Sequence, residues 1–232
     1  MSSTQAGHVL DNPIWYALNS HHAHIAIGTE WVKRYPSDVS VACALANHSD
    51  AAFKNLEEFI APDDTILLIE ANPPDDLAGW TIERTARLDQ LVCEAPLPQP
   101  KTDLDVVELN PADVPDMFAL IASAPHPAPF FPRTVEIGRY VGIRQQGQLV
   151  AMGGERYHLT GYCELSGIYT HPDWQGRGYA RLLTTILTNG IWDRGETPFL
   201  HVYPDNASAY HLYETMHYHK RCNMVGHYMS HQ

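Results

Sequence analysis

The sequence predicts a mixed α/β fold, and three observations support this prediction. Short apolar runs of strand length alternate with amphipathic stretches of helix length along the whole chain. Clusters of glycine and proline separate these runs, as turns require. A proline-rich segment at 95–103, APLPQPKTD, interrupts the pattern near the middle of the chain. We therefore expect two α/β regions, 1–100 and 101–232.

The first region is expected to open with a helix and to continue mainly as strands. Asp11, Asn12 and Pro13 form a plausible start for that helix, because proline is tolerated in a first turn. The expected elements are a helix over 10–18, strands over 23–28 and 40–47, a helix over 51–60, and strands over 65–70 and 80–94. No motif in this region indicates a particular chemistry, and it could be a degenerate copy of the second region.

The second region has a longer and more regular order of elements. We expect a strand over 106–109, a helix over 112–122 capped by Asn110, a hairpin of strands over 140–144 and 148–156, a strand over 162–170, a helix from 180, a strand over 199–203, a helix over 207–216 and a strand over 219–229. The proline-rich loop HPAPFFPRT should hold Phe130 and Phe131 on extended backbone. These rings either line a pocket or fill the core.

Composition restricts the class of function. The net charge of -12, from 15 Lys and Arg against 27 Asp and Glu, argues against nucleic-acid binding and mildly favours an amine-bearing partner. No apolar run reaches the roughly 18 residues of a membrane helix. The N-terminus does not resemble a secretory signal, so a cytoplasmic location is expected.

The four cysteines are widely spaced and should be reduced. The histidine clusters lack a recognised ligand spacing, so we expect no metal.

The most informative stretch runs from 164 to 187, where a short apolar strand leads through a glycine-bearing loop into an amphipathic helix. Gly176 and Gly178 would let a ligand approach the backbone, and the first turn of the helix offers unpaired amides to an anion. Arg177 and Arg181 would add positive charge. A Walker loop would need a GK[ST] ending and a dinucleotide loop a third glycine, and neither is present.

The loop instead fits the pattern [QR]-x-x-G-x-[GA] at Gln175, Gly178 and Ala180, which resembles the acetyl-coenzyme A loop of the GNAT N-acetyltransferases, in particular their FR47-like branch. A second motif of that family, N-x-x-A-x-x-x-Y-E-x-x-G-[FY], is matched by Asn206, Ala209, Tyr213, Glu214 and Tyr218. The chain has His217 where the family has glycine, which predicts a strained or altered helix end. The order of elements from about residue 104 onward also matches the GNAT fold.

This resemblance implies a GNAT acyl-CoA N-acyltransferase fold with an N-terminal α/β extension. It implies transfer of an acetyl group from acetyl-CoA directly to an amine in a ternary complex, with no metal and no covalent enzyme intermediate. It also implies a set of cofactor-binding residues: Ile168, Tyr169, Thr170, Gln175, Gly176, Arg177, Gly178, Tyr179, Ala180, Arg181 and Asn206.

The resemblance also suggests which residues would move protons. An amine with a pKa of about 10.4 is mostly protonated at neutral pH and must lose a proton before it can attack. Glu164 stands where the histone-acetyltransferase branch keeps its catalytic glutamate; Glu155 or a water chain are the alternatives. Tyr213 is the candidate acid for the leaving thiolate, the alternative being a packing role.

Two other functions remain open at this stage. A non-catalytic sensor that binds acyl-CoA would keep the loop but not the acceptor chemistry, and His217 favours it. A nucleotide-binding regulator would depend only on Gly176 and Gly178. The acceptor could be a small-molecule or peptide amine, and the protein is expected to be a monomer or homodimer without nucleic-acid or membrane partners.

Overall fold

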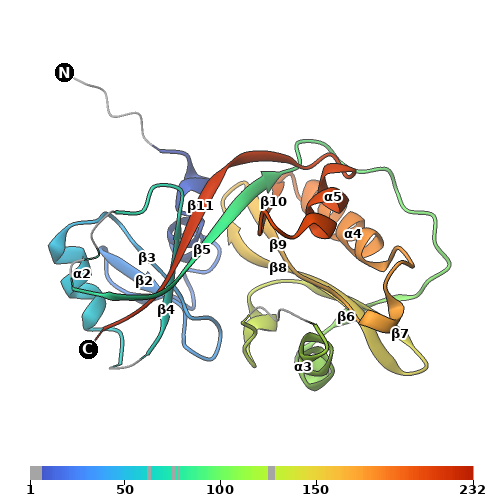
Figure 1. Cartoon of the computed structure of the whole chain (residues 1–232), viewed down its shortest axis with the longest axis horizontal. Helices are drawn as coiled ribbons and strands as arrows, with labels where there is room; N and C mark the ends of the chain where they lie inside the picture. The colour runs from blue at the N-terminus through green and yellow to red at the C-terminus, as the bar shows by residue number, and fades with distance from the viewer. Residues whose placement is uncertain (1–6, 62–63, 75–76, 78, 125–128, 232) are drawn as a thin grey trace.

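The computed structural model describes residues 7–61, 64–74, 77, 79–124 and 129–231, and its strands form one mixed 11-stranded sheet (Figure 1). The strands are β1 (Ile27–Gly28), β2 (Val32–Arg34), β3 (Ala42–Leu45), β4 (Ile66–Glu70), β5 (Thr81–Val92), β6 (Val106–Leu109), β7 (Tyr140–Gln145), β8 (Gln148–Leu159), β9 (Tyr162–Thr170), β10 (Thr197–Val202) and β11 (His219–Ser230). The helices are α1 (Pro13–Leu18), α2 (Asp50–Glu57), α3 (Val114–Ala122), α4 (Tyr179–Asp193) and α5 (Ala207–Glu214). The mixed α/β class predicted from the sequence is confirmed.

Most predicted elements are present, with differences at their ends. The strand expected over 23–28 is only β1, because residues 19–25 form turns. The short strand β2 was not predicted, since a three-residue strand carries almost no periodic signal. Strand β8 continues past the expected residue 156 to Leu159.

The two halves of the sheet repeat one arrangement. In the first half β1, β2 and β3 pair antiparallel, and β3 then pairs parallel with β4 across the connecting helix α2. In the second half β7, β8 and β9 pair antiparallel, and β9 pairs parallel with β10 across α4. The pairing order of the first half therefore resembles that of the second half.

The strands that follow each repeat are exchanged between the halves. Strand β5 follows β4 in the chain but pairs with β10, and β11 follows β10 but pairs with β4. The exchanged strands pair with each other at the centre of the sheet, which has the order β1-β2-β3-β4-β11-β5-β10-β9-β8-β7-β6. Both halves therefore share one hydrogen-bonded sheet, and the domain boundary near residue 100 stays a prediction.

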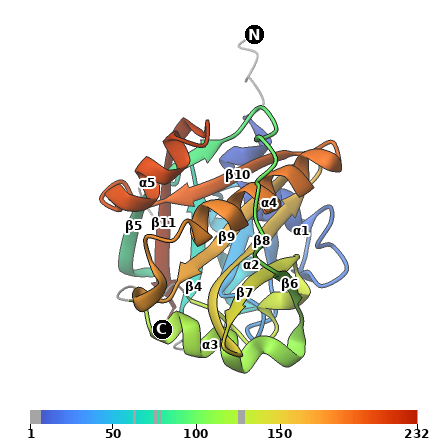
Figure 2. The ribbon, with the colours of Figure 1, turned by 90° about the vertical axis from the view of Figure 1, so that its right-hand side faces the viewer.

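Helices cover both faces of the sheet. In the second half α4 and α5 lie on one side and α3 on the other (Figure 2). In the first half β3 is buried on both faces, because Ala42 and Ala44 pack with α1 while Cys43 and Leu45 pack with α2. No helix in the described part of the chain has the length and apolar content needed to cross a membrane.

The proline-rich segment after β5 crosses over α4. Its Leu97 is buried, and its backbone exchanges two hydrogen bonds with the side chain of Asn189, at 2.8 and 3.0 Å. Since these contacts fix the segment on the helix, the residues that follow Leu97 become part of the surface beside the start of α4.

Candidate functional site

The centre of the site is a fork between β9 and β10. The two strands pair over Tyr162–Glu164 and Thr197–Phe199, and their pairing ends there. Beyond this point β10 pairs with β5, while β9 pairs only with β8. Residues 166–170 of β9 are therefore only partly buried, although the strand lies inside the sheet. The free edge of β9 offers main-chain groups to an extended ligand.

A bulge lies on this free edge. Met152 faces Tyr169 and Gly154 faces Ser166, so Gly167 and Ile168 together oppose one residue of β8. Gly167 has a φ of 65°, which an L side chain rarely adopts. The bulge redirects the backbone at Ile168, one of the predicted cofactor-binding positions. Tyr169 and Thr170 follow it to the end of β9.

The strand leads into the predicted phosphate loop. Gly176 and Gly178 have φ values of 75° and 79°, and a Cβ atom at either position would meet nothing within 4 Å. The loop needs glycine for its backbone conformation, and the space beside it is open. No side chain caps α4, whose N-cap is Gly178, so the first-turn amides at Tyr179, Ala180 and Arg181 remain available to an anion.

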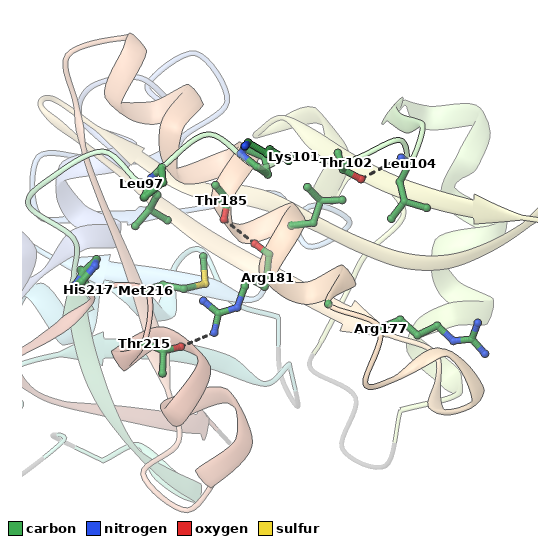
Figure 3. Close-up of a pocket in the computed structure, with 14 residues that line it drawn as sticks. Leu97, Lys101, Thr102, Leu104, Arg177, Arg181, Thr185, Thr215, Met216 and His217 are labelled. Atoms are coloured by element: carbon green, nitrogen blue, oxygen red, sulfur yellow. Dashed lines mark hydrogen bonds between the residues drawn. The ribbon is translucent and has the colours of Figure 1, made fainter.

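A cavity of about 440 Å³ opens beside this helix start (Figure 3). It lies between the segment after Leu97, the first turns of α4 and the end of α5. Its lining includes Lys101, Arg177, Arg181 and His217, a local excess of basic groups on a chain of net charge -12. An anionic ligand would find complementary charge here.

The side chains of the loop are held in place by neighbours. The guanidinium of Arg177 lies 4.5 Å from the ring centroid of Trp174, and that ring stacks on buried Tyr179. Arg181 donates a hydrogen bond to Thr215 Oγ1 at the end of α5. Gln175 donates a hydrogen bond of 3.4 Å to the carbonyl of Thr170. The structure thus brings the predicted cofactor residues of 168–181 along one continuous path.

Asn206 is not among the residues that line the cavity. It is exposed at the N-cap of α5, where its Oδ1 accepts a hydrogen bond of 3.2 Å from the amide of Ala209. This capping bond gives the residue a structural role.

Glu164 stands at the branch point of the fork and is fully buried. Its carboxylate accepts hydrogen bonds of 2.7 and 2.8 Å from Arg156 and lies 2.7 Å from His201 Nδ1. Burial alone would raise the pKa of Glu164, but the charge and hydrogen bonds of Arg156 and His201 outweigh it and lower the pKa to about 2. A carboxylate held in this way is a weak base, which disfavours the predicted catalytic role.

The reserve candidate, Glu155, is also buried and paired. Its carboxylate accepts hydrogen bonds of 3.1 and 3.2 Å from Arg194, just beyond α4. Both predicted carboxylates are therefore engaged by an arginine.

Tyr213 lies on the buried side of α5, with its ring centroid 5.8 Å from that of Tyr218. Burial raises the pKa of Tyr213 to about 12, so its hydroxyl stays protonated at neutral pH. Among the described residues no hydrogen bond involves this hydroxyl, whereas Tyr218 bonds to Thr188 at 2.7 Å. The hydroxyl of Tyr213 therefore has donor capacity to spare.

The helix end after Tyr213 keeps the conformation that usually requires glycine. His217 has a φ of 61°, one of two positive values among the described non-glycine residues. The strained end predicted from the sequence is therefore present, and it places His217 at the rim of the basic cavity.

A second, small cavity of about 30 Å³ lies where the two halves of the sheet meet. Arg156, Tyr157, Tyr228 and Phe131 are among its lining residues, with parts of 39–41. The other predicted ring, Phe130, packs between Phe118 and Tyr140, at centroid distances of 5.4 and 6.0 Å. Phe130 thus packs against the core and Phe131 lines a pocket. Residues 125–128 of the same loop lie outside the described residues.

Sequence reasoning did not identify several residues of the site. Lys101 and Thr102 were assigned to a linker, although they line the basic cavity. Arg156 and His201 carried no signal, because their importance depends on the pairing of β8, β9 and β10 around Glu164. A basic residue directly after a proline-rich segment is the one hint that the sequence offered for Lys101.

Comparisons with known proteins agree with this geometry. The family model described as FR47-like protein matches residues 140–225. One similar solved structure is a GNAT-family protein from Novosphingobium aromaticivorans DSM 12444, which is described as a candidate acetyltransferase. Its sequence is 32% identical to this chain, and the TM-score is 0.89. The match covers 97% of this chain and 100% of the other. A GCN5-related N-acetyltransferase from Kribbella flavida shares the fold, with 18% sequence identity and a TM-score of 0.62. That match covers 98% of this chain and 96% of the other. No curated protein matches the sequence significantly.

Proposed function

Since this chain belongs to the GNAT family of acetyltransferases, we propose that it binds acetyl-CoA and transfers the acetyl group directly to an amine in a ternary complex. The observation that carries this proposal is the continuous path from the fork at Glu164, along the free edge of β9, to the glycine loop and the basic cavity. Few ligands combine an extended amide-bearing arm with phosphates at one end, as coenzyme A does.

The residues along this path fit such a ligand. Main-chain groups of Ile168 and Thr170 on the free edge would pair with the amides of the pantetheine arm. The amides from Gly176 to Arg181 would hold the pyrophosphate, supported by the charges of Arg177 and Arg181. Asn206 would act indirectly, by fixing the start of α5.

When bound, acetyl-CoA supplies a thioester carbonyl that an uncharged amine can attack. A main-chain amide at the bulge of β9 would stabilise the negative charge that develops on the carbonyl oxygen. Tyr213 would donate a proton to the departing thiolate, because its hydroxyl is protonated and has no partner among the described residues. Water at the open edge would accept the proton of the amine, since Glu164 and Glu155 are both engaged by arginines.

The paired carboxylates also favour a second candidate function. A chain whose buried glutamates serve only structure could bind acyl-CoA as a sensor without transferring the acetyl group. Titration of acetyl-CoA by calorimetry, followed by measurement of free CoA thiol in the presence of a panel of amines, separates the two functions. Transfer predicts amine-dependent thiol release above the rate without amine, and a sensor predicts binding alone.

The variant Gly178→Glu tests the acetyl-CoA binding site, whether the protein is a transferase or a sensor. It places a carboxylate on the open side of the loop and strains a backbone at φ 79°. We expect at least a tenfold loss of affinity for acetyl-CoA. An affinity equal to that of the wild type would contradict the assignment of this loop.

A further inference from the structure

Three potential metal ligands converge on side chains that the proposed reaction does not use. His21 lies in the turns after α1, His158 lies near the end of β8, and Glu196 lies between α4 and β10. One ligand atom of each residue lies within 4.8 Å of the other two. Because the three residues come from distant parts of the chain, no ligand spacing was visible in the sequence.

The two imidazoles are already arranged as neighbours. The rings of His21 and His158 stack with centroids 3.7 Å apart and an interplanar angle of 9°, and His158 Nε2 lies 2.6 Å from Glu196 Oε1. Burial and the neighbouring His158 lower the pKa of His21, so its ring is favoured in the neutral form that metals bind. Two imidazoles and one carboxylate form a ligand set that is typical of zinc sites with an open position.

The charges around the cluster permit a cation. Arg194 donates a hydrogen bond of 3.1 Å to Glu196 Oε2, but its other nitrogens bind Glu155. One arginine is thus shared by two carboxylates. The Glu196 Oε1 atom faces His158 and not the arginine.

We propose that His21, His158 and Glu196 bind one divalent transition-metal ion, with Zn²⁺ as the best match, and that solvent completes its coordination. A tetrahedral zinc ion needs ligand atoms roughly 3.3 Å apart, as follows from metal–ligand distances of about 2.0–2.1 Å. Stacked rings cannot both point at one ion, so His21 must tilt toward Glu196. It is exposed and lies in a turn, so this tilt needs no movement of the core.

The ion would join the N-terminal extension to the second half of the sheet, because His21 belongs to the first part and the other two ligands to the second. Its effect would therefore be on stability. Zinc at a hundredfold excess over its dissociation constant should raise the melting temperature by roughly 5 °C or more.

The test uses the full-length chain without a histidine tag, stripped of metal with a chelator. Zn²⁺ is titrated by calorimetry, and Co²⁺ is titrated separately because its visible absorption reports tetrahedral coordination. We expect one equivalent of Zn²⁺ for the wild type and at least a tenfold loss of affinity in His21→Ala and in Glu196→Gln. The control is His211→Ala, which removes an exposed histidine of α5 that lies outside the cluster and should bind like the wild type.

Three results would overturn the proposal. They are a wild-type chain that binds no Zn²⁺ stoichiometrically, a His21→Ala variant with unchanged affinity, and a His211→Ala variant that loses as much affinity as His21→Ala. His21 is exposed, so its removal should leave the fold intact, and circular dichroism checks this. None of these readouts depends on acetyl transfer.

Discussion

Replacing Glu164 by glutamine distinguishes a catalytic carboxylate from a structural one. The substitution keeps the size of the side chain but removes the charge that compensates Arg156, whose nitrogens lie 2.7 and 2.8 Å from the fully buried carboxylate. Removing one partner of a buried ion pair costs about 3–5 kcal/mol. For a chain of this length, that corresponds to a fall in melting temperature of roughly 6–20 °C.

The lowered pKa of Glu164 sets the pH range in which this ion pair stabilises the fold. Its value of about 2 in the folded state lies below the ordinary 4.5, so the folded state favours the ionised form. The resulting stability is present in full above about pH 4.5 and is lost as the pH falls toward 2.

The assays are thermal unfolding at pH 7 and acetyl transfer between pH 7 and pH 10, for Glu164→Gln and for the matched control Glu155→Gln. We expect the larger loss of stability in Glu164→Gln, because the partner of Glu155 is more exposed: the side chain of Arg194 is 37% exposed and that of Arg156 is 25% exposed. The reasoning is refuted by a Glu164→Gln variant that unfolds like the wild type while its activity falls at pH 7 and recovers at pH 10. That outcome would restore Glu164 as the base.

Three further substitutions test the acid, a buried histidine and the strained helix end. Tyr213→Phe removes only the hydroxyl and keeps the buried ring, so turnover should fall about ten- to a thousandfold with unchanged affinity for acetyl-CoA. Full turnover would leave Tyr213 a packing residue. Burial lowers the pKa of His22 from 6.5 to about 4, so on acidification the unfolded state binds a proton before the folded state does. The free energy of unfolding should therefore drop by up to ~3 kcal/mol as the pH falls from 6.5 to 4. Urea unfolding should show a shallower drop for His22→Gln. His217→Gly relieves a left-handed φ of 61° and should raise stability by about 0.5–1 kcal/mol, measured by thermal unfolding; a lower melting temperature would mean that the imidazole itself stabilises the turn.

The sequence predicted the parts of the site that are local in the chain. The glycine loop and the helix after it are specified within a few residues, because Gly176 and Gly178 are needed for their backbone conformation and the apolar period sets the helix. The strained end at His217 was visible for the same reason, as a departure from a local pattern.

Contacts between side chains on neighbouring strands could not be predicted from the sequence pattern. Glu164 was assigned a catalytic role by its position, but its environment depends on bulges in β8 and β9 that bring Arg156 opposite it. A shift of one residue in that register would turn the arginine to the other face of the sheet. The pattern of apolar residues does not show where a bulge lies, so the ion pair could not be predicted.

The strand exchange gives the first region a part in the site, although it carries none of the motifs. Strand β5 pairs with β10 from Val92 opposite Phe199 to Asp89 opposite Val202, and so holds β10 away from β9 beyond the fork. Gln90 of this strand donates a hydrogen bond of 3.0 Å to His201 Nε2, which leaves Nδ1 as the nitrogen that donates to Glu164. The open edge of β9 and the ionised state of Glu164 therefore both depend on a strand from before the proline-rich segment. A cofactor path built by the second region alone would lack the strand that keeps the fork open.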